Sequence, residues 1–165
     1  MLPYILKSAK QLERAGADFI VIPCNTLHEI LPILKQEIKI PFIDLVEETS
    51  KILENFKKVA ILSSKRTKES QIYDHFFKNT QVIYPTEDEQ DKVSQIILRI
   101  INKTTTDEDK SCLNKIILCL KDRGAEKIVL ACTDLANLVE IDNDFIIDTQ
   151  DILINSIKIK MGDLK

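Results

Sequence analysis

Glycine is scarce in this chain, with only three among 165 residues. Dinucleotide-binding loops of the form GxGxxG, and phosphate-binding loops of the form GxxxxGK followed by Ser or Thr, need closely spaced glycines. Three glycines cannot supply either loop. The sequence therefore argues against nucleotide-dependent enzymes of these two types.

The chain also lacks a strong charge of either sign and long apolar runs. Its 23 basic and 26 acidic residues give a net charge of −3. The chain has no long run of charges of one sign, so nothing suggests a nucleic-acid groove or a membrane-binding face. The longest apolar runs are strand-sized, and no basic segment followed by a hydrophobic one opens the chain. We therefore expect a cytoplasmic protein without nucleic-acid partner, membrane span or signal peptide.

The four cysteines lack the spacing of a metal site or a disulfide framework. They form no CxxC pair and have no pair of histidines nearby, which argues against structural zinc. Cysteines in an intracellular chain of this size are usually free thiols. Cys112 and Cys119 lie two helical turns apart, and we expect both to be small, buried hydrophobic residues.

One pattern does occur, and it occurs twice. Residues 16–26 read GADFIVIPCNT, and residues 124–134 read GAEKIVLACTD. Each copy predicts a helix closed by a left-handed glycine, then a buried parallel strand, then a cysteine at the strand's carboxyl end. Because ligands of open α/β sheets bind at those ends, we expect Cys24 and Cys132 to face each other across a cleft.

Strands alternating with helices predict an α/β fold of two similar domains with mainly parallel sheets. Residues 45–142 hold a complete set of strands and helices and are expected to form one domain. Residues 1–44 and 143–165 are expected to pair as the other. That first domain looks truncated, because the chain opens on a helix and not on a strand. A further helix is expected to place residues 72–77 in the core.

A thiolate suits the removal of a weakly acidic proton from carbon without a cofactor. Its formation requires a lowered pKa, which helix N-termini and nearby cations provide. Both cysteines lie where a strand gives way to an expected helix start, which would also favour a substrate carboxylate. Beside the thiols, side-chain donors or simple helix caps are provided by Asn25, Thr26 and Thr133.

Two further polar residues stand near the cysteines in sequence. His28 lies one helical turn after Cys24, and is either a hydrogen-bond partner or proton relay near the thiol, or a surface or cap histidine. Asp134 either orients the Cys132 thiol or binds an ammonium group, or is an ordinary acid of a first helical turn. His75 has no polar cluster nearby and is interpreted as structural.

These motifs resemble a known family. The segments PCNT (23–26) with His28, and ACTDL (131–135), are similar to the paired cysteine motifs of the aspartate/glutamate racemase family, most closely its aspartate racemase branch. The segment LSSKRT (62–67) resembles the family's threonine-bearing loop, and PTEDEQ (85–90) resembles a helix start common in that branch. The resemblance covers nearly the whole chain.

The resemblance implies a racemase of acidic amino acids that uses no cofactor and no metal, with the site between two α/β domains. Cys24 and Cys132 would be the opposed base and acid, exchanging roles for the two enantiomers, with His28 and Asp134 in support. The substrate's carboxylates and ammonium group would be held by Asn25, Thr26, Thr67 and Thr133. Members of the family are commonly homodimers.

The chain departs from the family pattern in several places. The family's opening strand and glycine-rich loop, and the further elements that follow them, are absent. Ala131 stands where glycine is usual, and Asp134 stands where the aspartate racemase branch usually has glutamate. A lysine frequent in that branch is replaced by Asn102, with Lys103 one position on.

Three alternatives stay open. In the first, the chain is a truncated, inactive remnant that binds a dicarboxylate or a partner chain. Alternatively, the same thiols isomerise or decarboxylate a small diacid, as other members of the superfamily do. The weakest alternative is redox chemistry or metal capture by the two thiols.

Overall fold

The computed structural model describes residues 1–77, 79–140 and 144–162. Its strands are β1 (Ile20–Val21), β2 (Phe42–Ile43), β3 (Lys58–Ser63), β4 (Gln81–Ile83), β5 (Lys127–Ala131) and β6 (Ile146–Asp148). Its α-helices are α1 (Leu2–Arg14), α2 (Leu31–Glu37), α3 (Leu45–Leu53), α4 (Lys65–Ser70), α5 (Glu87–Ile101), α6 (Asp107–Asp122) and α7 (Thr149–Gly162). Two 3₁₀ helices are η1 (Asn25–Ile30) and η2 (Ala136–Leu138). Within these ranges, no helix combines the length and apolar character that crossing a membrane requires.

The larger sheet has four parallel strands in the order β4-β3-β5-β6. Its central strands pair along their length, from Val59 opposite Lys127 to Ser63 opposite Ala131. All residues of β3 and β5 except the first of each are buried. Such near-continuous apolar runs are typical of parallel strands covered on both faces, and the expected α/β fold with parallel sheets is confirmed.

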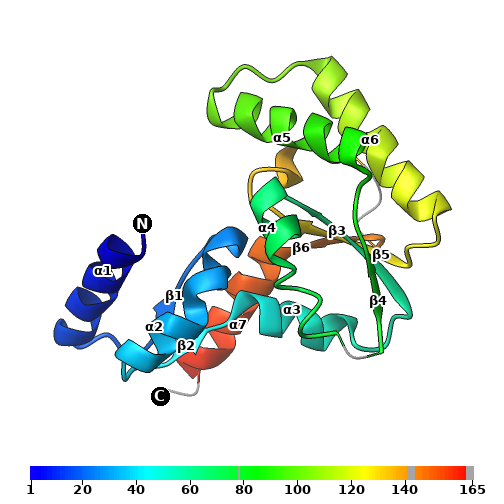
Figure 1. The fold of residues 1–165 in the computed structure, drawn as a ribbon. Coiled ribbons are helices and arrows are strands. Elements are labelled where there is room, and N and C mark those ends of the chain that lie inside the picture. Colours follow the sequence, from blue (N-terminus) through cyan, green and yellow to red (C-terminus); the bar gives the residue numbers. More distant parts are fainter. Residues whose placement is uncertain (78, 141–143, 163–165) are drawn as a thin grey trace.

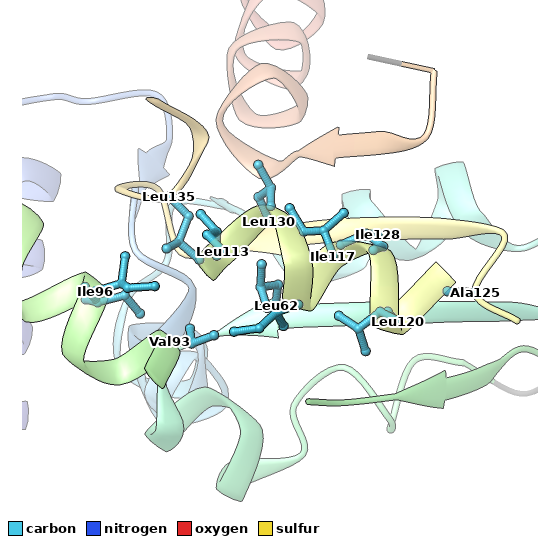
Figure 2. Close-up of a cluster of buried hydrophobic side chains, with 13 residues drawn as sticks. Leu62, Val93, Ile96, Leu113, Ile117, Leu120, Ala125, Ile128, Leu130 and Leu135 are labelled. Atoms are coloured by element: carbon cyan, nitrogen blue, oxygen red, sulfur yellow. The ribbon is translucent and has the colours of Figure 1, made fainter. Parts of the chain in front are cut away.

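Helices α5 and α6 cover one face of this sheet. Alternate residues of the two central strands point toward them, and Figure 2 shows Leu62, Leu130 and Ile117 meeting in one apolar cluster. Each of these three side chains is at most 1% exposed. Burying one such side chain contributes about 1.5–3 kcal/mol to folding, so this cluster fixes the carboxyl ends of β3 and β5 beside each other.

Helix α3 and the segment after α4 cover the opposite face. There Val59 and Ile61 of β3 pack against Leu53 of α3 and against Tyr73, whose side chain is fully buried. The side chains of β3 therefore alternate between two separate clusters, as the twofold period of a strand requires.

The smaller sheet consists of β1 and β2, which pair in parallel. Ile20 of β1 packs against Ala9 of α1, and Ile22 packs against Leu34 of α2. On the other face, Val21 lies against a cluster that contains Leu45 at the start of α3 and residues of α7. Figure 1 shows this unit at the lower left, beside the larger sheet with α5 and α6 at the upper right.

The last strand joins the larger sheet. β6 pairs with β5, with Ile147 opposite Val129. The expected division places residues 143–165 with residues 1–44. Within that segment, α7 lies with the smaller sheet, where it runs beside α3 and β2. The assignment of residues 45–142 to one domain and of residues 1–44 and 143–165 to the other stays a prediction.

Both expected left-handed glycines are confirmed. Gly16 follows α1 with φ +83°, and Gly124 follows α6 with φ +90°. Each is the hinge where a helix ends and the chain turns into a strand, and residues with a Cβ rarely adopt this backbone conformation. The two copies of the sequence pattern therefore fold alike up to their cysteines.

Two local predictions are wrong. Helix α4 ends at Ser70, so residues 72–77 form turns and not a helix, although Ile72 and Tyr73 do pack in the core. The end comes at Gln71, which takes the left-handed conformation with φ 51°. Cys119 is exposed and not buried, whereas Cys112 is half-buried on the same helix.

Candidate active site

The two cysteines occupy matching turns. Cys24 follows β1, and the N–H of Leu27 donates to the Cys24 carbonyl over 3.2 Å. Cys132 follows β5, and the N–H of Leu135 donates to the Cys132 carbonyl over 3.1 Å. Both thiols are free and half-buried. The repeated pattern therefore extends to the turn that carries each thiol, at the carboxyl end of a parallel strand.

The two thiols lie within electrostatic range of each other. Burial raises the pKa of the Cys132 thiol to about 11, with smaller contributions from the Asp134 carboxylate and from a charge on Cys24. Cys132 Sγ donates to Asp134 Oδ2 over 3.8 Å, which favours the protonated thiol. At neutral pH the Cys132 thiol therefore keeps its proton, with Asp134 as its hydrogen-bond partner.

Three hydroxyl groups connect the Cys24 turn to the end of β3. Thr26 Oγ1 lies 2.9 Å from Ser64 Oγ and 2.8 Å from Thr67 Oγ1, and these last two lie 3.0 Å from each other. Thr67 is fully buried. Thr26 is thus no helix cap; the structure brings it together with Thr67 from a segment 41 residues away.

Asn25 is held at both ends of its side-chain amide. Its Oδ1 accepts from the Tyr73 hydroxyl over 2.5 Å, and its Nδ2 donates to Thr149 Oγ1 over 3.0 Å. Thr149 in turn donates to the Leu130 carbonyl over 2.9 Å. Asn25 is 2% exposed, so its amide joins the Cys24 turn to β5 and α7.

His28 uses both ring nitrogens in holding the backbone. The N–H of Leu45 donates to Nε2 over 3.1 Å, and Nδ1 lies 3.0 Å from the Cys24 carbonyl. Because Nε2 is the acceptor, the ring proton belongs on Nδ1, where it donates to the carbonyl. Burial lowers the pKa of His28. His28 is thus neutral and links the Cys24 turn to α3 by hydrogen bonds. Neither ring nitrogen is left for a proton relay.

We expect His28→Gln to flatten the acid dependence of stability. As pH falls below about 6.5 the unfolded histidine gains a proton that the folded one resists, so the free energy of unfolding decreases by up to about 1.4 kcal/mol per pH unit. Urea unfolding between pH 7.5 and 5.5 measures this slope. His75→Gln, which replaces the exposed histidine, is the matched control; an equal slope in His28→Gln and the parent would contradict the assignment.

Thr133 and Gln150 complete the surroundings of Cys132. Gln150 Nε2 donates to the Thr133 carbonyl over 2.5 Å, and the Thr133 side chain is half-buried. Among residues 1–77, 79–140 and 144–162, no three histidine, cysteine or acidic side chains gather as a metal site.

Sequence reasoning missed several polar residues around this site: Ser64, Tyr73, Gln90, Thr149 and Gln150. Thr149 and Gln150 follow β6 directly, so the rule that ligands bind at the carboxyl ends of parallel strands would have found them. Ser64 is the residue after β3, and the same rule applies to it. Tyr73 follows no strand, and no sequence signal points to its bond with Asn25.

The structure defines an α/β protein with parallel sheets and with a free thiol on each of two matching turns. The family model for Asp/Glu/hydantoin racemases matches residues 2–157. The chain therefore belongs to the Asp/Glu/hydantoin racemase family, and the resemblance in its motifs is confirmed. It is also 32% identical over 133 residues to the broad specificity amino-acid racemase RacX of Bacillus subtilis (strain 168). That match covers 79% of this chain and 58% of RacX.

Solved structures share the fold. An aspartate racemase homologue from Pyrococcus horikoshii OT3 superposes with a TM-score of 0.77 at 21% identity, over 98% of this chain and 74% of that one. The aspartate racemase of Picrophilus torridus gives 0.74 at 25% identity, over 90% and 64%. The glutamate racemase of Francisella tularensis, in complex with D-glutamate, gives 0.69 at 19% identity, over 97% and 64%. The two-domain α/β fold class expected from the sequence is thereby confirmed.

Proposed function

We propose that the protein racemises an acidic amino acid, with aspartate the first candidate, by two-base proton transfer between Cys24 and Cys132. One observation carries the proposal. The two thiols lie on two matching turns, each at the carboxyl end of a parallel strand, and they are close enough for their charges to interact. Family membership and the aspartate racemases of the same fold support the choice of substrate.

In the proposed reaction one cysteine takes the α-proton as a thiolate while the other gives a proton to the opposite face as a thiol. The C–H bond breaks and an S–H bond forms on the first cysteine. The S–H bond of the second breaks as the new C–H bond forms, so one proton is taken and one is returned. Because Cys132 holds its proton to about pH 11, it is the acid for the enantiomer whose α-proton Cys24 removes.

The surrounding polar groups suit the ends of a small diacid. The hydroxyl groups of Thr26, Ser64 and Thr67 satisfy one another in this structure, and hydroxyl groups can rotate to donate to a carboxylate. Thr133 lies next to Cys132 and adds a further hydroxyl group. Asn25 and His28 act by holding the Cys24 turn, since their polar atoms already bind protein groups.

We expect the protein to interconvert L- and D-aspartate without added cofactor, with the same kcat/KM profile against pH for both enantiomers. The pair must carry one proton during the reaction. The rate therefore falls as the pH approaches about 11, where Cys132 loses its proton. Chiral chromatography measures both directions. Binding of aspartate without interconversion would contradict the proposal and favour a non-catalytic dicarboxylate-binding protein.

A further inference from the structure

One polar atom in the interior lacks a partner. Gln90 lies in the second turn of α5 and is fully buried, and its Oε1 is the only buried side-chain nitrogen or oxygen without a hydrogen bond among the described residues. Buried carbonyl groups are nearly always paired, so such an exception calls for a physical explanation. An apolar side chain of the same shape would avoid the cost of the unpaired oxygen.

The nitrogen of the same amide binds the backbone next to the candidate site. Gln90 Nε2 donates to the carbonyl of Ser63 over 3.0 Å. Ser63 is the last residue of β3, and the next residue, Ser64, caps α4 by accepting from the N–H of Thr67. Gln90 therefore holds the turn from which the hydroxyl groups of Ser64 and Thr67 reach Thr26.

A second contact fixes the start of α5 against α4. Lys68 Nζ donates to the Pro85 carbonyl over 3.0 Å and to Glu87 Oε1 over 2.7 Å. The capping box of Thr86 and Glu89 closes the first turn of α5. These contacts hold the first turn of α5, and with it the Gln90 amide, in place beside α4. A movement of that amide would move the Ser63 carbonyl.

We propose that Gln90 is a positioning residue for substrate binding, acting through Ser63 on the hydroxyl groups of Ser64 and Thr67. This inference rests on the proposed function for its kinetic readout and on aspartate binding for a readout free of turnover. The unpaired Oε1 means that the amide is kept for the geometry of the site and not for stability.

The test compares Gln90→Met with Gln95→Met, which changes an exposed glutamine on the same helix. We expect Gln90→Met to melt within a few degrees of the parent, because the lost hydrogen bond is offset by removal of the unpaired acceptor. Its KM and its calorimetric Kd for aspartate should rise roughly 10- to 100-fold, since misplaced binding groups cost about this much. Gln95→Met should match the parent in all three measurements.

Gln90→Glu provides a second variant that keeps the shape of the side chain. Burial raises the pKa of a carboxyl group, so at low pH the neutral acid retains one O–H donor for the Ser63 carbonyl. We expect the ratio of its kcat/KM to that of the parent to fall as pH rises and the donor is lost. A merely structural residue would lower the melting temperature and leave this ratio constant.

The outcomes separate this inference from the proposed function. If the parent racemises aspartate and both Gln90 variants behave like Gln95→Met, the inference is overturned and the function stands. If the parent binds aspartate without racemising it, the function fails, and weaker binding by Gln90→Met still supports the inference. A parent that does neither overturns both.

Discussion

Cys24→Ser and Cys132→Ser are each expected to lower kcat for aspartate racemisation by about 10²- to 10⁴-fold in both directions. A serine hydroxyl is nearly the size of a thiol but far less acidic, so it can neither form the required anion nor return a proton as readily. Both cysteines are half-buried on turns held by backbone bonds, so the folds should survive. Initial rates with each enantiomer, alongside melting temperatures, measure the effect.

The other two cysteines provide matched controls. Cys112 lies on α6 half-buried against the core, and Cys119 is exposed on the same helix. Neither lies at the carboxyl end of a strand, so Cys112→Ser and Cys119→Ser should keep the parent's activity. An equal loss of activity from either control would defeat the assignment of Cys24 and Cys132 as the acid and base.

Asn25→Ala is expected to lower the free energy of unfolding by about 2–4 kcal/mol. The change leaves the buried Tyr73 hydroxyl without its acceptor and removes the donor to Thr149. It also frees the turn that carries Cys24, so activity should fall as well. Urea unfolding at pH 7.5 measures the loss of stability.

The exposed Asn137 of η2 offers the matched control. Asn137→Ala should change stability by less than about 0.5 kcal/mol, as surface substitutions usually do. Tyr73→Phe, combined with Asn25→Ala in a double-mutant cycle, isolates the bond between the two side chains. Additive losses would show that Asn25 and Tyr73 do not act together, contrary to the geometry.

The order of strands and helices, the paired cysteines and the two left-handed glycines could be predicted from sequence because each depends on a local pattern. A buried parallel strand reads as an apolar run, and a helix ending in glycine precedes it in both copies. The capping box of Thr86 and Glu89 at the start of α5 is an equally local feature. Proximity of the two thiols followed from the rule for the carboxyl ends of parallel strands.

The roles of the polar residues could not be predicted, because they depend on contacts between distant segments. Asn25 looked like a helix cap, but its partners Tyr73 and Thr149 lie 48 and 124 residues away. The sequence left His28 open as a partner or proton relay near the thiol or as a surface or cap histidine, yet the N–H of Leu45 occupies its Nε2. Pro32 also changes the local structure. Its ring would clash with the His28 carbonyl in an unbroken α-helix that started at Asn25. The chain instead forms the 3₁₀ helix η1 before α2 begins at Leu31.

The end of α4 was missed for a different reason. Its last turn is closed by Gln71 in the left-handed conformation, a position that glycine usually fills. Without a glycine at that position, the apolar residues after it looked like a continued helix. The packing of Ile72 and Tyr73 against β3 holds this turn in place.

Exchange of the α-proton of aspartate with solvent deuterium tests the paired thiols most directly, followed by NMR from each pure enantiomer. Two-base transfer predicts that deuterium enters with inversion, so that the first product formed is the labelled opposite enantiomer while the remaining substrate stays unlabelled. Cys24→Ser and Cys132→Ser should each block this inversion from both enantiomers. In the parent, rapid labelling of the starting enantiomer with retention would contradict the account, as would inversion that survives loss of either thiol.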